Sequence, residues 1–172
     1  DLTANTSWVL GLLFGDGSIH NNGRVQIACG PDLDVCEKVE AILESKATIY
    51  NVRNCWHVEV FSKPMSRSLL ALGVHSAKTY TMLMPAIDRT LVNNMVRGAI
   101  ESDGCIRRHN GSLSIEYDSA SCAFANSMSV AIGLMTGQCA RVHIRQRPPP
   151  RATMYRICYR GVNANKVAEW LY

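Results

Sequence analysis

Two aspartates stand at matching places in a repeated segment of the chain. The twelve residues 8–19 (WVLGLLFGDGSI) recur as residues 95–106 (MVRGAIESDGCI), a constant 87 residues later, and Val, Gly, Asp, Gly and Ile coincide. Each copy has the pattern of a buried helix that ends in Asp-Gly, so we expect Asp16 and Asp103 about a pseudo-twofold axis. Two symmetric carboxylates suit a symmetric task, such as cutting both strands of a duplex.

Small residues in the two helices predict how the helices pack. Gly11 and Gly15 are four residues apart in the first copy, and Gly98 and Ser102 take the same places in the second. A glycine inside a helix costs roughly 1 kcal/mol of stability relative to alanine, so the presence of glycine at these positions needs a reason. Close approach of two helices is such a reason, and it would bring the two aspartates side by side at the helix ends.

This arrangement predicts a metal site. Helix C-termini are partially negative and two carboxylates repel each other, a conflict that a divalent cation resolves. Asp16 and Asp103, with backbone carbonyls at Gly15 and Ser102 and with waters, form a hard oxygen site suited to Mg²⁺. Mg²⁺ facing a phosphodiester can activate water and stabilise the leaving oxygen. One Asp-Gly pair could simply cap a helix into a hairpin, but its repetition favours the metal site.

The elements that position these residues repeat in one order, αββαββα, which predicts an α+β protein of two pseudo-symmetric half-domains packed through the two motif helices. The first half is predicted at 1–75, a connector at 76–90 and the second half at 91–172. Elements of the first half are expected at 8–15 with Ser7 as N-cap, 18–20, 24–29, 32–45, 47–53, 55–63 and 65–72. Later elements are expected at 76–84 (a connector helix), 91–102, 105–117 (a hairpin), 120–136, 139–147, 154–160 and 163–171.

Strand alternation predicts an open polar face on each sheet. In the strand 139–147, the side chains of Arg141, His143, Arg145 and Arg147 would point one way, opposite Val142 and Ile144. A merely solvated face more often mixes Lys, Glu and Thr, so this set favours nucleic acid; a β-ribbon fits the major groove. The predicted DNA contacts are His20, Arg24, Gln26, Arg53, His57, Arg107, Arg108, Ser112, Ser114, Arg141, His143, Arg145, Arg147, Arg151 and Arg156. We expect mid-strand Arg145 to contact bases and Arg151, beside the proline-rich loop, to contact phosphate.

Composition limits the class of protein, the type of metal site and the cell compartment. The chain has 172 residues, 47% of them hydrophobic, and a net charge of +4, so it can bury a core. Basic residues gather in 139–172, with seven Lys or Arg against one acid, whereas 32–44 holds five acids and one Lys. The seven cysteines form no Cys-x-x-Cys pair, which disfavours zinc. Their odd number and the lack of a recognisable signal peptide predict an intracellular protein, in a prokaryotic cytoplasm or else an organelle. The apolar run 8–14 is too short to span a membrane.

Both repeated segments resemble the LAGLIDADG motif of homing endonucleases, as 9–17 (VLGLLFGDG) and 96–104 (VRGAIESDG). The αββαββα half resembles the family too, so the likeness covers nearly the whole chain. It implies a monomer that binds a long, nearly palindromic double-stranded DNA with saddle-shaped antiparallel sheets and cuts across the minor groove, leaving four-base 3′ overhangs. The metal-binding acid of the eighth motif position is Asp16 or Asp103. The family's sixth-position Asp is replaced by Phe14 and Glu101, at a less essential position.

The resemblance also implies Mg²⁺ as cofactor, replaceable by Mn²⁺, with Ca²⁺ supporting binding but little or no cutting. A basic residue late in each half would lie near the scissile phosphates, and Lys63 and Arg160 are the nearest matches. Alternatives are an RNA-splicing maturase, a non-catalytic DNA-binding regulator of the same fold, and an intein-embedded nuclease, although no splicing-type ends are visible. No Gly-rich phosphate loop, Gly-x-Ser-x-Gly elbow or His-Glu-x-x-His motif points outside this fold.

Overall fold

The computed structural model describes residues 2–44, 47–75, 78–148 and 150–172. The first half consists of α1 (Ala4–Asp16), β1 (Gly17–Ile19), β2 (Arg24–Gly30), α2 (Leu33–Leu43), β3 (Thr48–Val52), β4 (Cys55–Phe61) and α3 (Lys63–Ala71). The second half consists of α4 (Val92–Asp103), β5 (Gly104–His109), β6 (Ser112–Ser119), α5 (Cys122–Thr136), β7 (His143–Arg145), β8 (Met154–Arg160) and α6 (Val162–Leu171). The predicted α+β class and the order αββαββα in each half are confirmed.

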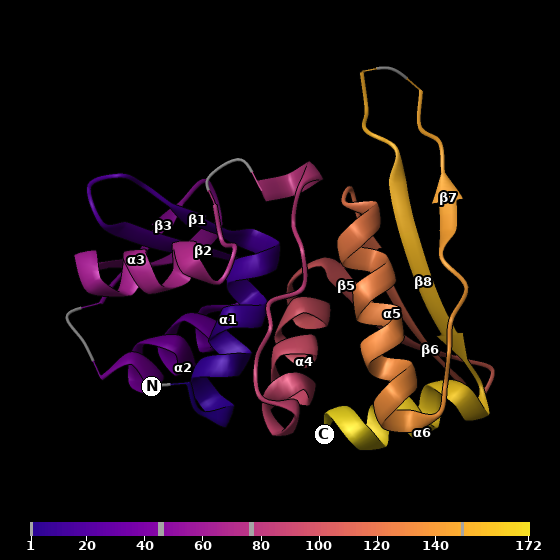
Figure 1. The fold of residues 1–172 in the computed structure, drawn as a ribbon. Helices are drawn as coiled ribbons and strands as arrows, with labels where there is room; N and C mark the ends of the chain where they lie inside the picture. The colour runs from indigo at the N-terminus through magenta and orange to yellow at the C-terminus, as the bar shows by residue number, and fades with distance from the viewer. Residues whose placement is uncertain (1, 45–46, 76–77, 149) are drawn as a thin grey trace.

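Each half forms a four-stranded antiparallel sheet with the same strand order. The orders are β1-β2-β4-β3 and β5-β6-β8-β7. The registers match as well, because Gly17 faces Ile27 in the first sheet and Gly104 faces Tyr117 in the second. Figure 1 shows α1 and α4 side by side at the centre of the molecule, and these two helices make the most extensive contact between any two described elements.

One face of each sheet is covered by helices and forms the core. Val25 and Ile27 of β2 and Val58 of β4 are buried, as are Ile115 of β6 and Ile157 of β8. Helices α1 and α2 contact the first sheet, and α4, α5 and α6 contact the second. The predicted alternation is therefore confirmed along β2, β4 and β8, and it leaves the opposite face of each sheet without a covering helix.

Helix α1 begins earlier than predicted. Thr3 is its N-cap, and Thr3 and Thr6 form a reciprocal capping box, so the helix starts at Ala4. Ser7 is not the cap. It is buried inside the helix, and its Oγ donates a 2.9 Å hydrogen bond to the carbonyl of Leu91 in the second half. The Ser7 hydroxyl, which the sequence pattern predicted as the helix cap, therefore makes a long-range contact instead.

The predicted connector helix at 76–84 does not form among the described residues. A short 3₁₀ turn (Lys78–Tyr80) is followed by chain without regular structure and by a second turn (Arg89–Leu91), while 76–77 lie outside the described residues. β-Branched threonines and Pro85 weaken the helix locally. The Met82 carbonyl accepts a 2.7 Å hydrogen bond from Ser121 Oγ, and the Met82 side chain is buried. The connector is therefore anchored to the start of α5.

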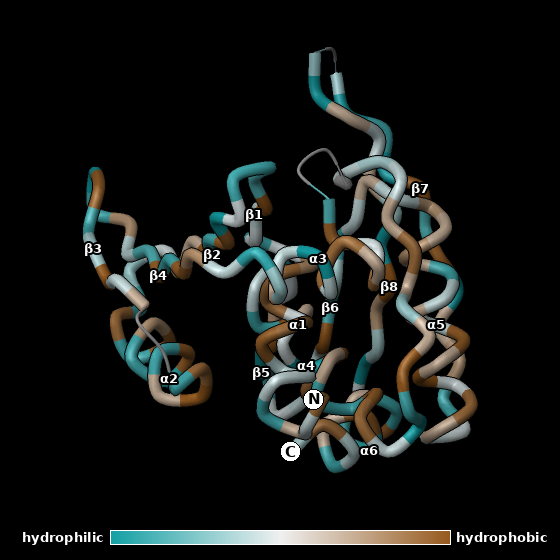
Figure 2. The backbone as a smooth tube through the Cα atoms, turned by 60° about the vertical axis from the view of Figure 1, so that its left-hand side comes forward, coloured by the Kyte–Doolittle hydropathy of each residue, from teal (hydrophilic) through white to brown (hydrophobic). Residues whose placement is uncertain are grey.

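Strand β7 is shorter than the predicted strand 139–147. Before it, the chain follows α5, where the Ala140 carbonyl accepts a 2.7 Å hydrogen bond from Ser129 Oγ. Beyond it, β7 and β8 lead into an arm that extends past the helices (Figure 1), and the coloured stretches on either side of its tip are mostly hydrophilic (Figure 2). Strand alternation placed Ile144 on the face opposite the arginines, which implies a covering helix, but Ile144 is 68% exposed, so this prediction is wrong. Val142 is half-buried and packs against the core, as expected.

Candidate metal and nucleic-acid site

The motif helices approach each other to backbone contact. A Cβ atom added to Gly11 would lie 2.1 Å from the carbonyl oxygen of Met95, and one added to Gly98 would lie 2.1 Å from that of Trp8. Real Cβ atoms essentially never come within 3.0 Å of such an atom. Only glycine fits at both places, and the equal distances express the pseudo-twofold relation of the helices. The predicted close packing of α1 and α4 is confirmed.

The C-terminal ends of these helices carry the two acids. Asp16 and Asp103 are both exposed, so a ligand can reach their carboxylates. A Cβ added to Gly15 would lie 3.2 Å from Asp103 Oδ2 and 2.0 Å from Ser102 Oγ. The Asp103 carboxylate therefore reaches across the helix interface to the residue that precedes Asp16.

Two cavities lie at these helix ends, one for each acid. The first, of about 190 Å³, is lined by Asp16 and Ser102 together with Cys29 and Asp32. The second, of about 300 Å³, is lined by Asp103 and Gly15. Each cavity thus joins the acid of one motif to the small residue that precedes the acid of the other. The structure brings together all four residues predicted to hold metal.

This donor set fits a hard divalent cation. The described residues contain no cluster of three or more His, Cys, Asp or Glu side chains that could hold an ion. Mg²⁺ does not need one, because it keeps several waters and binds through one or two carboxylates plus substrate phosphate. The first cavity also contains the Cys29 thiol, whose pKa is raised by burial and by neighbouring Cys36, so the neutral thiol is favoured when no metal is bound. The cavities therefore offer mainly oxygen ligands.

The outward face of the first sheet carries a connected polar cluster. Gln26 Nε2 donates a 2.9 Å hydrogen bond to Tyr50 Oη and lies 3.0 Å from His57 Nδ1. The ring of Tyr50 stacks on that of His57, with centroids 5.2 Å apart. The Arg24 guanidinium donates to Glu59. Arg24, Gln26 and His57 were predicted DNA contacts, and they lie together on one open surface.

The second sheet holds its arginines against two acids. Arg107 donates to Glu116 at 3.0 Å. Arg156 donates to Asp118 at 2.9 Å and also lies 2.8 Å from Glu116. Arg145 donates to Asp118 at 3.2 Å. The hydrogen bond from Arg156 holds the pKa of Asp118 below its ordinary value, so this carboxylate stays charged.

Glu116 and Asp118 are the residues that sequence analysis missed on this face. A signal for them existed, because they follow Ser112 and Ser114 at a period of two along β6. The predicted strongly basic surface is therefore partly neutralised. A carboxylate held among arginines disfavours a bound phosphate, whereas Asp and Glu can accept from cytosine N4 and Arg can bind guanine.

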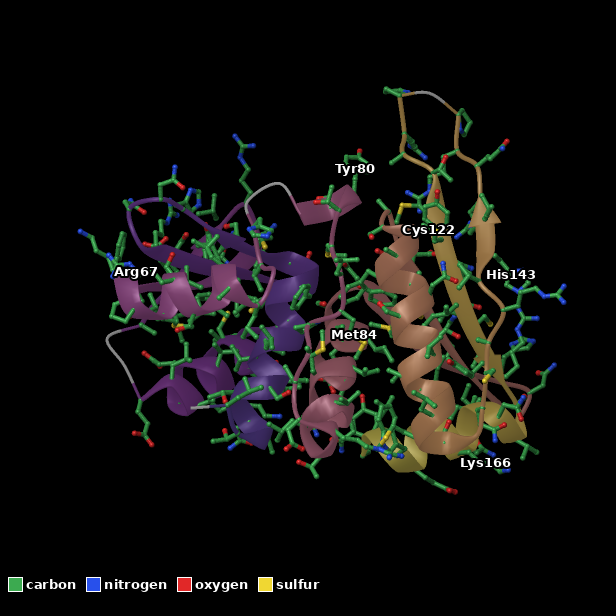
Figure 3. All side chains as sticks on the ribbon, in the orientation of Figure 1. Arg67, Tyr80, Met84, Cys122, His143 and Lys166 are labelled. Atoms are coloured by element: carbon green, nitrogen blue, oxygen red, sulfur yellow. The ribbon has the colours of Figure 1, made fainter. Side chains whose placement is uncertain are left out.

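The other predicted DNA contacts lie on exposed loops and edges. Arg141 and Arg147 flank β7 instead of belonging to it, so strand alternation does not orient them. His143, labelled in Figure 3, lies on the edge strand β7 opposite Arg156 of β8. The remaining exposed contacts are His20, Arg53, Arg108, Ser112 and Arg151. Ser114 is half-buried within β6.

Lys63 lies away from the two acids. It begins α3 instead of ending β4, because Ser62 caps that helix. Ser62 N donates to the Gly23 carbonyl at 2.9 Å, and a Cβ on Gly23 would meet Lys63 Cγ at 2.9 Å. Gly23 is four residues from Ile27, which faces the residue after Asp16, so about 14 Å of strand separates them. The structure does not bring Lys63 to the metal cavities.

Arg160 is not the symmetry partner of Lys63. In the second half, Gly161 N donates to the Leu113 carbonyl at 2.8 Å, which corresponds to the bond from Ser62 in the first half. The residue that matches Lys63 is therefore Val162. The Arg160 guanidinium is exposed and lies 3.9 Å from Glu116, so it belongs to the arginine–acid cluster of the outward face.

Glu101, at the sixth motif position, joins the two halves. Its Oε2 accepts a 2.6 Å hydrogen bond from Trp8 Nε1, and its Oε1 accepts one of 2.9 Å from the Tyr172 hydroxyl. Arg97 lies 3.8 Å from the same carboxylate. This residue therefore ties the first motif helix to the second and to the last residue of the chain.

No protein-family model matches the sequence, and no curated protein matches it either. The fold is nevertheless similar to solved structures over most of the chain. I-DmoI in complex with DNA and Mn has a TM-score of 0.62 and 12% identity, over 91% of this chain and 89% of that one. I-WcaI bound to its DNA recognition sequence has a TM-score of 0.60 and 14% identity, over 98% and 79%. The N-terminal LAGLIDADG domain of DUF199/WhiA has a TM-score of 0.62 and 9% identity, over 98% and 79%.

These identities are too low to carry an activity from one protein to another, and the fold occurs both in homing endonucleases and in the DUF199/WhiA protein. Among the described residues, no helix has the length and apolar character needed to cross a membrane. Element order, sheet topology and the central helix pair agree with the similar structures. The chain therefore has the two-half-domain LAGLIDADG fold.

Proposed function

We propose that the protein is a site-specific, divalent-metal-dependent DNA endonuclease of the homing type. It would act as a monomer on a long, nearly palindromic duplex, cut both strands across the minor groove and leave 3′ overhangs. The proposal rests chiefly on the two exposed acids, Asp16 and Asp103, which stand at matching ends of helices in backbone contact. The similar structures include the homing endonuclease I-DmoI in complex with DNA and Mn, and a variant of it with its target DNA in the presence of Mg, which supports the proposal.

Residues at the ends of the two motif helices would bind the cation. Asp16 and Asp103 would hold the cation, with carbonyls of Gly15 and Ser102 in the same two cavities. A bound divalent cation supplies an activated water and stabilises the leaving oxygen. Mg²⁺ is the expected ion, Mn²⁺ should replace it, and Ca²⁺ should support binding with little cutting. Because each cavity holds one acid, each would serve one strand of the duplex.

The two open sheet faces would position the DNA on either side of the helix pair. Residues held by acid partners, such as Arg107 and Arg156, present fixed donors toward base edges. Exposed loop residues such as Arg151 suit phosphate contacts, which give affinity and a salt dependence but no sequence information. A pseudo-symmetric target follows from two sheets of equal topology with different side chains.

Plasmid cleavage tests this proposal. The protein is incubated with Mg²⁺ and a plasmid that carries the uninterrupted host locus, and one linear product with 3′ overhangs is expected. Asp16→Asn and Asp103→Asn should each abolish double-strand cleavage and keep binding in Ca²⁺, and EDTA should stop the wild type. Glu169→Gln, an exposed acid on α6, is the matched control and should cut normally. Binding by the wild type without any cleavage would leave a DNA-binding protein of this fold, and the nuclease proposal would fail.

A further inference from the structure

Tyr117 lies opposite the residue that follows the second motif acid. It stands opposite Gly104 in the ladder between β5 and β6, and Gly104 follows Asp103 in the chain. Opposite residues of an antiparallel pair have Cα atoms only about 4.5–5.5 Å apart. The Tyr117 ring is held against Phe124, with centroids 6.1 Å apart, and Phe124 stacks on Phe14 of the first motif helix at 5.3 Å. The ring is thus fixed between the two halves.

The hydroxyl of this tyrosine is buried and unsatisfied. Tyr117 is 1% exposed, and its Oη has no hydrogen-bond partner among the described residues. Leaving a buried polar group unsatisfied costs roughly 1–3 kcal/mol, so such groups in a folded protein need an explanation. Burial raises the pKa of Tyr117, and the charges of Asp103 and then Asp16 raise it further. The neutral hydroxyl therefore has an unused hydrogen-bond donor, and the charges of both motif acids act on it.

The matching position in the first half has no hydroxyl. Ile27 faces Gly17 there, as Tyr117 faces Gly104 in the second half. Ile27 is buried and apolar, so this matching position supplies no hydroxyl. The two acids occupy matching positions in sequence and in helix geometry, but the buried residues across the strand pair from them differ, Ile27 in the first half and Tyr117 in the second.

We propose that Tyr117 is a positioning residue for the divalent cation held at Asp103. Its hydroxyl donates a hydrogen bond to one water, which in turn donates to the Asp103 carboxylate and fixes the orientation in which that carboxylate binds the ion. Groups that orient a metal ligand in this way typically change metal affinity by about 10- to 100-fold when they are removed. This inference rests on the proposed metal-dependent function.

Tyr117→Phe tests the inference because it removes one oxygen and keeps the ring. Tyr159→Phe is the matched control: Tyr159 is a buried phenol on the neighbouring strand β8, where it faces Ile115, and its hydroxyl neighbours Ser129 and Cys139 instead of the motif acids. Mn²⁺ binding is measured on full-length protein without DNA, from the loss of the free-ion EPR signal. Tyr117→Phe should weaken Mn²⁺ binding about tenfold or more, and Tyr159→Phe should leave it unchanged.

Two further measurements separate positioning from a structural role. Metal-free Tyr117→Phe should unfold close to the wild-type temperature, because the hydroxyl has no direct hydrogen bond to another described residue to lose. With a strand-labelled target, Tyr117→Phe should slow one of the two cuts, so that nicked product accumulates. Equal Mn²⁺ affinity in wild type and Tyr117→Phe overturns the inference, as does a loss of stability without a change in affinity. Wild-type protein that binds Mn²⁺ but cuts no DNA would contradict only the nuclease proposal. The Mn²⁺ affinities of wild type and Tyr117→Phe would still decide the role of Tyr117. Wild-type protein that binds no Mn²⁺ without DNA would overturn the inference, and the plasmid-cleavage assay would still decide the nuclease proposal.

Discussion

Replacement of Gly11 by alanine should force the two halves of the protein apart. The new Cβ would lie 2.1 Å from the Met95 carbonyl oxygen, while real contacts begin at 3.0 Å, so the helices must separate by about 1 Å. Overpacking of this kind costs roughly 1–3 kcal/mol. The upper end applies because the obstacle is a backbone carbonyl, which cannot swing away. Alanine recovers roughly 1 kcal/mol of helix propensity, which leaves a net loss of about 2 kcal/mol.

Thermal unfolding measures this loss. In a domain of this size each kcal/mol shifts the midpoint by roughly 2–4 °C, so Gly11→Ala should unfold about 4–8 °C below wild type. Gly98→Ala should behave alike, since its Cβ would lie 2.1 Å from the Trp8 carbonyl. Asn5→Ala, at an exposed position of α1, gains helix propensity without any clash and should unfold at or slightly above the wild-type temperature. If Gly11→Ala unfolded together with Asn5→Ala, the backbone contact between α1 and α4 would be wrong.

Three more substitutions test separate parts of the structure. Arg156 depresses the pKa of Asp118, so this carboxylate stabilises the protein above its ordinary pKa of about 3.9, and the contribution disappears as pH falls through the lower folded-state value. Denaturant unfolding should show Asp118→Asn less stable than wild type at pH 7, and the difference should shrink as pH falls below the ordinary carboxyl pKa. Lys63→Met should reduce cleavage rate and DNA affinity by similar factors, because Lys63 lies far from the acids; a loss of rate alone would restore a catalytic role. Glu101→Gln should lower the free energy of unfolding by about 1 kcal/mol, since its amide oxygen can accept from Trp8 or Tyr172 but not from both as a carboxylate does.

The local parts of the fold followed from the sequence because their signals lie within a few residues. The hairpin turn at Asn110–Gly111 has positive φ at both positions, as its Asn-Gly sequence predicts. Strand β8 (Met154–Arg160) and the end of α5 at Gly137 agree with the prediction for the same reason. Errors arose where a distant partner competes with a local preference. Ser7 bonds to Leu91 instead of capping its own helix, and Met82 bonds to Ser121 instead of joining a connector helix.

By itself, the sequence determined the repeated motif, the glycines that let two helices touch, the two acids at matching positions and the order of elements in each half. Only the tertiary structure decided which end of the sheet each side chain occupies. It placed Lys63 beside Gly23, far from Asp16, and it set Arg156 against Asp118 across two strands. It also buried the Tyr117 hydroxyl behind the acids. Helix and strand periods are short-range properties, whereas cross-strand register and burial depend on contacts between residues far apart in the chain, which no local pattern specifies.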